Sequence, residues 1–363
     1  MSQYPESFHS RSYFYVGGEY VKTPGGTIFE NQMYVERLQP TDVTKLYPVV
    51  FIHGGAQTGT NWLNKPDGGH GWASWFLDHG YEVYIVDQVH TGRSAWSPKS
   101  AFPQIVAPAE YMQQHFTATK NYPLWPQAHG HTQWPGTGMM GDPIFDAYYA
   151  SQSQFLLDTI EQERTMRLAG IALLDKIGAS ILITHSRGGL HGWAWADARP
   201  TLIKALIQIE PRGPPFHEAV FSTKFVRPWG LTSIPLTYDP PPEDEKAPLT
   251  TKILPASSEL EVDCYLQEEP ARQLVNLKNI PILVVTGAAS YHATYDHSIV
   301  AFLEQAGCEN VEHMKLADLG IHGNGHMLFM EKNSDEIAEA LDTWIVNTSN
   351  DGKEEPIEAS DDR

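Results

Sequence analysis

The chain has 363 residues, of which 41% are hydrophobic and 19% are charged, and its 44 acidic and 25 basic residues give a net charge of −19. This acidity disfavours binding to nucleic acid or to anionic membrane surfaces, and no stretch approaches the ~20 apolar residues of a membrane span. The two cysteines, Cys264 and Cys308, provide neither a disulfide framework nor the spacing of metal ligands.

Two strand-like stretches, residues 11–16 and 27–38, come first and flank the turn sequence T-P-G-G at 23–26. We expect them to pair as antiparallel strands. Strands and helices then alternate along the chain. Strands are expected at 48–52, 82–86, 181–184, 202–209, 281–286 and 311–316, and helices at 72–79, 145–176, 190–198, 295–306 and 334–346. This alternation predicts an α/β fold with a mostly parallel sheet.

Two segments without clear periodicity, residues 88–145 and 212–278, interrupt this order. The first is rich in Pro, Gly, His and Trp, and we expect a few short helices in the second. Long irregular segments inside compact domains are usually functional, so we predict that both form a lid over one face of the molecule. The chain would then be a single domain over residues 11–347, followed by an acidic, disordered tail at 348–363.

Ser186 stands where a buried strand turns into a helix, in the sequence I-T-H-S-R-G-G. A serine at such a turn, with glycine two residues later, has the form of a nucleophile elbow. Thr184 occupies the place of the first glycine in the pattern G-x-S-x-G, so the motif is incomplete. The alternative interpretation is that Ser186 only caps the following helix.

A serine nucleophile needs a base within hydrogen-bond reach. His326 is the expected base, because it lies in the glycine-rich loop I-H-G-N-G-H-M between the last strand and the last helix. His322, in the same loop, is the competing candidate and could instead hold the loop in place.

The base in turn needs an acidic partner that orients it. Glu210 is the expected acid, because it ends the strand that follows the elbow helix. A carboxylate at the end of an apolar strand is costly without a partner, so the alternative is a structural ion pair with Arg187 or Arg212. Asp296 is the second candidate acid, but we expect it to be a solvated residue at the start of a helix.

Two backbone N–H groups should stabilise the oxyanion of the reaction. One is expected from Arg187, directly after the nucleophile. The other should come from the turn H-G-G-A after the strand 48–52, from Gly55 or alternatively from Ala56. The competing interpretation of this sequence is a plain tight turn.

Aromatic side chains in the two irregular segments are candidates for a substrate pocket, although they could equally pack these segments onto the core. These are Trp96, Trp125, Trp134 and Trp229. Residues 136–141, G-T-G-M-M-G, match a dinucleotide fingerprint but lack the preceding strand that the motif requires. His129 and His131 lack a third ligand at suitable spacing. We therefore expect no cofactor and no metal.

The order serine, glutamate, histidine, each at a strand end, is that of the α/β-hydrolase fold. The sequence also resembles one branch of that fold, the bacterial esterase 713 type and its fungal relatives, over most of residues 11–347. The resemblance rests on F-I-H-G-G and T-G-T-N-W (51–62), P-D-G (66–68), G-W (71–72), G-Y-E-V-Y-I-V-D and T-G-R-S (80–94), G-D-P-I-F-D and Y-A-S-Q (141–152), T-H-S-R-G (184–188), I-E-P (209–211) and H-G-N-G-H-M (322–327).

The resemblance implies the nucleophile, acid and base named above and the oxyanion donors Gly55 and Arg187. It also makes Thr184 a feature of this branch. The chain departs from the branch at three places: some relatives carry adjacent cysteines where this chain has Gly55 and Ala56, related turns carry glycine in place of His90, and glutamine is expected in place of Arg187. Both of the last two side chains could reach the substrate, so we expect His90 to bind substrate together with Trp96 and Trp134.

We therefore expect a cytoplasmic serine hydrolase that cleaves an ester, lactone or thioester of an apolar small molecule through an acyl-serine. The cytoplasmic location follows from the first ten residues, which lack a basic region followed by an apolar run. One alternative is a non-hydrolytic enzyme of a natural-product pathway that forms or cleaves C–C bonds or transfers the acyl group. Another is a ligand-binding receptor on the same scaffold. The expected partner is the small-molecule substrate, and a homodimer is the assembly that we consider.

Overall fold

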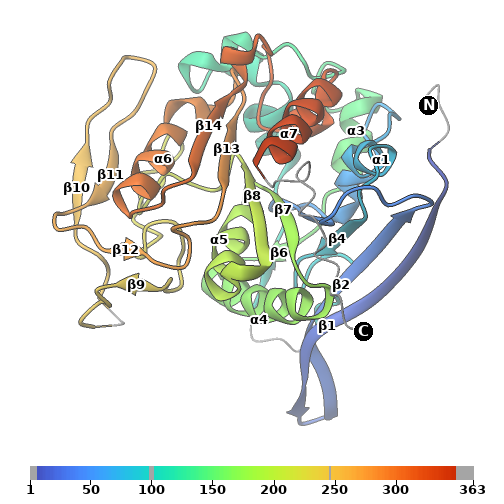
Figure 1. Cartoon of the computed structure of the whole chain (residues 1–363). Coiled ribbons are helices and arrows are strands. Elements are labelled where there is room, and N and C mark those ends of the chain that lie inside the picture. The colour runs from blue at the N-terminus through green and yellow to red at the C-terminus, as the bar shows by residue number, and fades with distance from the viewer. Residues whose placement is uncertain (1–5, 98–101, 245–246, 349–363) are drawn as a thin grey trace, which may run out of the picture.

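An eight-stranded sheet forms the centre of the computed structural model (Figure 1), which describes residues 6–97, 102–244 and 247–348. Its strands are β1 (His9–Thr23), β2 (Gly26–Pro40), β3 (Val49–Ile52), β4 (Val83–Asp87), β7 (Ser180–His185), β8 (Ile203–Ile209), β13 (Ile282–Thr286) and β14 (Val311–Lys315). They lie in the order β1-β2-β4-β3-β7-β8-β13-β14. The pairs β1–β2 and β2–β4 are antiparallel, and the remaining pairs are parallel. The predicted fold class is confirmed.

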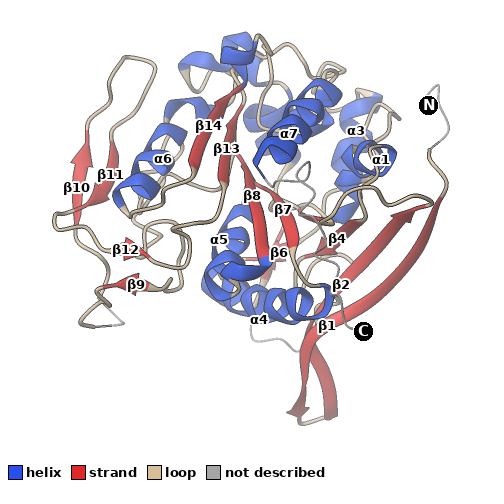
Figure 2. Ribbon diagram, viewed as in Figure 1, coloured by secondary structure: helices blue, strands red, loops and turns tan. Residues whose placement is uncertain are grey.

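Helices cover both faces of this sheet (Figure 2). They are α1 (Trp72–Asp78), α4 (Thr159–Ile177), α5 (Gly188–Ala198), α6 (Asp296–Gln305) and α7 (Ser334–Thr348). Side chains alternate between the faces along each strand. On β3, Val50 and Ile52 therefore pack into the core with α4, α5 and α6, whereas Val49 and Phe51 pack into the core with α1 and α7. Full burial of each such side chain stabilises the fold by roughly 1.5–3 kcal/mol.

The remaining elements are short and lie mainly in the connections. They are η1 (Gly59–Trp62), β5 (Gln104–Ile105), α2 (Ala109–Met112), η2 (Gln113–Thr117), η3 (Thr119–Asn121), η4 (Pro126–Gly130), α3 (Pro143–Ala150), β6 (Phe155–Leu156), η5 (Pro200–Leu202), β9 (Tyr238–Asp239), β10 (Thr251–Leu254), β11 (Cys264–Gln267), β12 (Gln273–Leu274), η6 (Tyr291–Thr294), η7 (Leu316–Leu319) and η8 (Leu328–Met330). The short helices expected within 212–278 are wrong: the described part of this segment contains four short strands, paired β10–β11 and β9–β12.

The single helix expected over 145–176 is also wrong, because the chain breaks into α3, β6 and α4. The hydroxyl of Ser151 donates to the carbonyl of Tyr148 at the end of α3, and the side chain of Asp158 accepts from the backbone N–H of Glu161 at the start of α4. Such local side-chain bonds compete with a continuous helix. The apolar periodicity spans the break, and it therefore concealed the two helix ends.

Arg93, in the T-G-R-S sequence at 91–94, forms ion pairs with two buried carboxylates. Arg93 binds Asp87 at 2.8 Å between Nε and Oδ2, and it also pairs with Glu36 on β2. Both carboxylates are fully buried, and removing one partner of a buried pair is strongly destabilising. Arg93 thus joins the N-terminal hairpin to the end of β4, which is a structural role.

The predicted acidic tail lies outside the described residues from position 349 onward, and residue 348 ends α7. In the described part of the chain, no helix combines the length and the apolar character that a membrane crossing requires.

Candidate active site

Ser186 follows β7 in a strained turn. Its φ of 53° lies in the left-handed region, which is uncommon for a residue with a side chain. The turn is tight: a Cβ at Gly188 would lie 2.6 Å from the carbonyl oxygen of His53, and one at Gly189 would lie 2.5 Å from Cβ of Pro211. The turn accommodates a threonine at position 184, where the motif has glycine, because the buried hydroxyl of Thr184 donates to the side chain of Gln208 on β8. Ser186 itself remains partly exposed.

The turns on either side of the elbow come from the neighbouring strands. β3 pairs with one edge of β7 and β8 with the other. A Cβ at Gly54 would lie 3.2 Å from Cβ of Ser186, and one at Gly55 would lie 3.4 Å from Cδ of Arg187. On the other side, the backbone N–H of Arg212 donates to the carbonyl of Ser186 at 2.9 Å. The glycine-rich turn therefore contacts the elbow directly.

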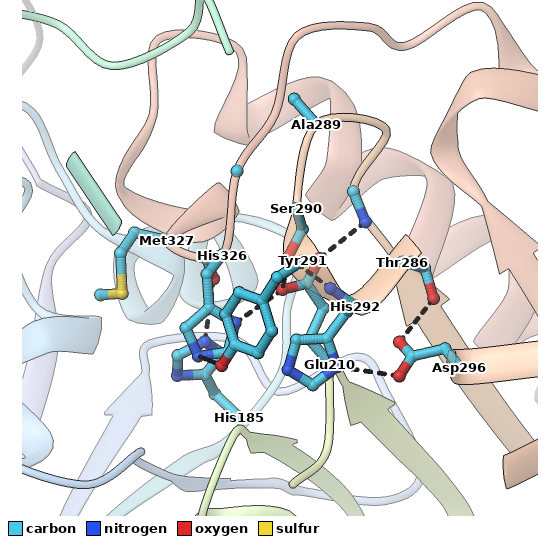
Figure 3. A network of polar contacts seen from close by, with 12 residues as sticks. His185, Glu210, Thr286, Ala289, Ser290, Tyr291, His292, Asp296, His326 and Met327 are labelled. Carbon is cyan, nitrogen blue, oxygen red and sulfur yellow. Dashed lines mark hydrogen bonds and ion pairs between the residues drawn. The ribbon is translucent and has the colours of Figure 1, made fainter. Parts of the chain in front are cut away.

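Glu210 and His326 lie together although 116 positions separate them along the chain (Figure 3). Nδ1 of His326 is 2.6 Å from Oε2 of Glu210. Glu210 also accepts from the hydroxyl of Ser290 at 2.7 Å and from the backbone N–H of Gly287 at 2.8 Å. These three contacts of the Glu210 carboxylate are short and buried, and none of them is with an arginine. The alternative pairing of Glu210 with Arg187 or Arg212 is therefore wrong.

Burial has opposite effects on the two partners. Desolvation lowers the pKa of His326 well below its ordinary value, and the imidazoles of His185 and His292 lower it further. Desolvation raises the pKa of Glu210, and the nearby carboxylate of Asp296 adds to this rise. The hydrogen bonds from Ser290 and Gly287 act in the opposite direction by stabilising the ionised form. The lowered pKa of His326 favours its neutral form, which is the form that a general base requires.

The loop that carries His326 is held by Glu331. Its carboxylate accepts from the backbone N–H of Gly325 and from the side chain of Asn324, and it lies 2.7 Å from Nε2 of His131. His322 is exposed, whereas His326 is buried. The structure thus brings His326 to Glu210 and leaves His322 outside. His131 has a structural partner, which accounts for one of the two histidines weighed as metal ligands.

The expected solvation of Asp296 is wrong. This residue is 1% exposed and starts α6 inside the protein. Its carboxylate accepts from the hydroxyl of Thr286 at 2.7 Å and lies 2.8 Å from Nδ1 of His292 (Figure 3). The ring of His292 stacks on that of His326 with centroids 4.9 Å apart. Asp296 therefore serves a second histidine and not the expected base.

A cavity of about 150 Å³ opens beside Ser186. Both irregular segments and the elbow contribute to its wall. The lining residues are Gly55, Ala56, Tyr111, Met112, Phe116, Phe155, Ser186, Arg187, Arg212, Gly213, Glu218, Ala219, Phe221, Tyr291 and Tyr295. The hydroxyl of Tyr291 lies 3.4 Å from Nε2 of His326, so the second ring nitrogen of the expected base contacts a residue of this wall.

Three residues expected to bind substrate do not line the cavity. Nε2 of His90 lies 2.9 Å from the side-chain oxygen of Asn31 on β2. Trp96 donates from its indole nitrogen to the carbonyl of Phe102. Trp134 packs edge-on against Tyr148 in the core. These side chains support the irregular segments, because the connections turn them inward instead of toward Ser186.

The residues that could hold a metal overlap with the same site. Among the described residues, the ligand atoms of Glu210, His292 and His326 lie within 4.8 Å of one another. Glu210 and His326 already bind each other, so a metal ion would have to displace their hydrogen bond.

The G-T-G-M-M-G sequence forms a turn whose Thr137 N–H is bound by Asp142, the residue that caps α3.

Several residues of the site carried no clear sequence signal. Phe116 comes from the π-helical turn η2, and its ring lies 5.1 Å from that of His326. Glu331 follows the histidine loop, yet only the folded loop makes it a partner of Gly325. Tyr291 could have been found, because it lies in the turn after β13, at the carboxyl edge of the sheet where such folds bind ligands.

The comparisons with known proteins agree with this architecture. No protein-family model matches the chain. It is 48% identical over 335 residues to a protein named "Probable secreted lipase phiG" from Fungal sp. (strain ATCC 74256), covering 92% of this chain and 89% of that protein. The solved structure of a novel bacterial esterase is 23% identical, with a TM-score of 0.64, over 95% of this chain and 98% of that one.

The fungal relative corrects one expectation. It is named a secreted protein, so the expected cytoplasmic location is not supported. A leader sequence is recognised by its composition alone, and the absence of that pattern was a weak basis for a location. At 48% identity over nearly the whole chain, and with this sheet topology, the chain belongs to the α/β-hydrolase superfamily as an ester-cleaving, carboxylesterase-like hydrolase of the family of this fungal lipase.

Proposed function

We propose that the protein is a serine hydrolase that cleaves its ester through an acyl-serine intermediate. Ser186 attacks the ester carbonyl, and His326 takes the proton of the serine and later activates water. Glu210 orients the imidazole and stabilises its charged form. The observation that carries the proposal is the 2.6 Å contact between Glu210 and Nδ1 of His326, whose Nε2 contacts Tyr291, a residue that lines the same cavity as Ser186.

The geometry supports this division of roles. Because Glu210 occupies Nδ1, the proposed proton acceptor is Nε2 of His326, which contacts the hydroxyl of Tyr291 at 3.4 Å, and Tyr291 lines the same cavity as Ser186. Among the described residues, no hydrogen bond engages the Ser186 hydroxyl. Apo enzymes often hold their catalytic hydrogen bonds long until substrate binds.

The backbone N–H groups of Gly55 and Arg187 are the proposed oxyanion donors, since both residues line the cavity at Ser186. Losing one such donor typically costs about 3 kcal/mol of transition-state stabilisation. The apolar side chains of the wall favour a substrate with an apolar hydrocarbon part. They are Met112, Phe116, Phe155 and Phe221. The two irregular segments that supply most of this wall would act as the lid, and the secreted relative supports an extracellular site of action.

A fluorophosphonate probe tests the mechanism directly. We expect stoichiometric modification of Ser186, found by mass spectrometry of the digested protein, together with turnover of p-nitrophenyl esters. Absence of both modification and turnover would refute the serine mechanism. Modification without ester turnover would instead favour a non-hydrolytic enzyme, and ligand binding without either would favour a receptor.

The pH dependence of the reaction should follow the low pKa of His326. The base is active when neutral, so kcat/KM should fall as acidification protonates the imidazole. Because burial and two neighbouring imidazoles lower this pKa, the midpoint of the acidic limb should lie below the ordinary 6.5. A pH–rate profile with p-nitrophenyl butyrate measures the midpoint, which belongs to the Glu210–His326 pair as a unit. A midpoint above 6.5 would contradict the assignment.

A further inference from the structure

The side chain of Arg187 is buried in the cavity wall without a charged partner. It is 4% exposed and lines the cavity beside Ser186. One of its nitrogens, Nη2, lies 3.3 Å from the hydroxyl of Thr159, and its Nε is buried without any hydrogen bond. Among the described residues, no ion pair includes Arg187.

Another buried arginine shows what a structural role looks like in this protein. Arg227 is 1% exposed and donates to the carbonyls of Pro214 and His217, and its Nη1 lies 3.1 Å from Glu218. The nitrogens of its guanidinium therefore have both carbonyl and carboxylate acceptors. A buried charge is costly unless it is paired and hydrogen-bonded, and Arg187 has neither a carboxylate nor a carbonyl.

The acidic groups nearest to Arg187 are bound elsewhere. Glu163 accepts from the backbone N–H groups of Ser233 and Ile234. Asp158 caps α4, and Glu218 is shared by Arg212 and Arg227. Burial and the nearby charge of Arg212 lower the pKa of Arg187 to about 9, so it still carries its charge at neutral pH. Among the described residues, no carboxylate forms an ion pair with this cation of the cavity wall.

The packing fixes this cation in place. The guanidinium lies 5.2 Å from the ring centroid of Phe155, which is also part of the wall. A Cβ at Gly55 would lie 3.4 Å from Cδ of Arg187, so the glycine turn packs against the stem of the side chain. A guanidinium held in this way is preorganised to bind a carboxylate through two parallel hydrogen bonds.

We propose that Arg187 binds a carboxylate in the acyl part of the substrate, so that the enzyme acts on half-esters of small dicarboxylic acids. This inference rests on the proposed function, since it places the ester carbonyl at Ser186. Ser186 and Arg187 line the same cavity, so an acyl group bound at Ser186 would share that cavity with Arg187. A cavity of about 150 Å³ suits a small acyl group.

Two esters of equal chain length test the proposal: the p-nitrophenyl monoester of glutaric acid and p-nitrophenyl pentanoate, each corrected for its rate without enzyme. The measured quantity is the ratio of their kcat/KM values, in which any loss common to both esters cancels. We expect a ratio above 30 for the unmodified enzyme and a ratio near 1 for Arg187→Gln, which keeps the backbone N–H. Arg187→Lys should retain part of the preference.

Arg212→Gln is the matched variant, because Arg212 lines the same cavity but is paired with Glu218. Its ratio should stay within a factor of three of the unmodified enzyme. A preference that disappears in Arg212→Gln and persists in Arg187→Gln would overturn the assignment to Arg187, as would the absence of any preference in the unmodified enzyme.

Binding of glutarate itself separates this inference from the serine mechanism. Glutarate should raise the Tm of the unmodified enzyme and of Ser186→Ala, but not that of Arg187→Gln, since only a ligand bound to the folded state stabilises it. Stabilisation without fluorophosphonate labelling would refute the serine mechanism and keep the anion site. Labelling of Ser186 without stabilisation and without ester preference would keep the mechanism and refute the anion site.

Discussion

Replacing Ser186 by alanine is expected to lower kcat by about 10⁶-fold, the loss seen when the nucleophile of a serine hydrolase is removed. The oxygen of this hydroxyl forms the bond to the acyl group. Among the described residues that line the cavity, Ser186 is the one serine or threonine. The three tyrosines of the wall, Tyr111, Tyr291 and Tyr295, all have a pKa raised by burial, which makes them poor substitutes as nucleophiles. Initial rates with p-nitrophenyl butyrate measure the effect.

Ser180→Ala is the matched control for this substitution. Ser180 starts the same strand β7 at its opposite end, and its buried hydroxyl makes no hydrogen bond. Its removal leaves no partner unsatisfied, so activity and fluorophosphonate labelling should both be retained. If Ser186→Ala kept more than one hundredth of the activity, or if the probe still labelled it, Ser186 would not be the nucleophile.

Replacing Glu210 by glutamine is expected to lower kcat by about 10⁴-fold, as for the equivalent change in serine proteases. Both orientations of the new amide are unfavourable. With its NH₂ at the position of Oε2, the amide faces Nδ1 of His326 and favours the wrong tautomer. With its NH₂ at the position of Oε1, it faces the backbone N–H of Gly287, which now finds a donor in place of an acceptor.

Asp296→Asn is the control that distinguishes the two candidate acids. Asp296 is as buried as Glu210, but its partners are His292 and Thr286. Its substitution should change kcat by less than tenfold, because it touches neither His326 nor Ser186. Larger damage from Asp296→Asn than from Glu210→Gln would reverse the assignment of the acid. Circular dichroism of both variants separates a catalytic loss from unfolding.

Much of this architecture followed from local sequence pattern. The parallel strands were predicted to within one residue at each end, because short apolar runs bounded by turn residues carry their own signal. Ser186, Glu210 and His326 were placed at the ends of such strands, and parallel strands bring their carboxyl ends to one edge. Their expected roles followed from these positions, and the family resemblance implied the same roles. The long helix over 145–176 failed because apolar periodicity does not register the side-chain bonds that end a helix.

Only the tertiary structure decided which side chains meet. His322 and His326 are four residues apart, yet His322 is exposed and His326 is buried. Glu331 fixes the loop between them by accepting a hydrogen bond from the backbone N–H of Gly325. His90, Trp96 and Trp134 were expected in the cavity, but irregular segments have no periodicity from which to read the direction of a side chain. Local pattern identifies strand ends because each is encoded by adjacent residues. The partner of a buried charge depends on residues far along the chain, and so the isolation of Arg187 became visible only in the fold.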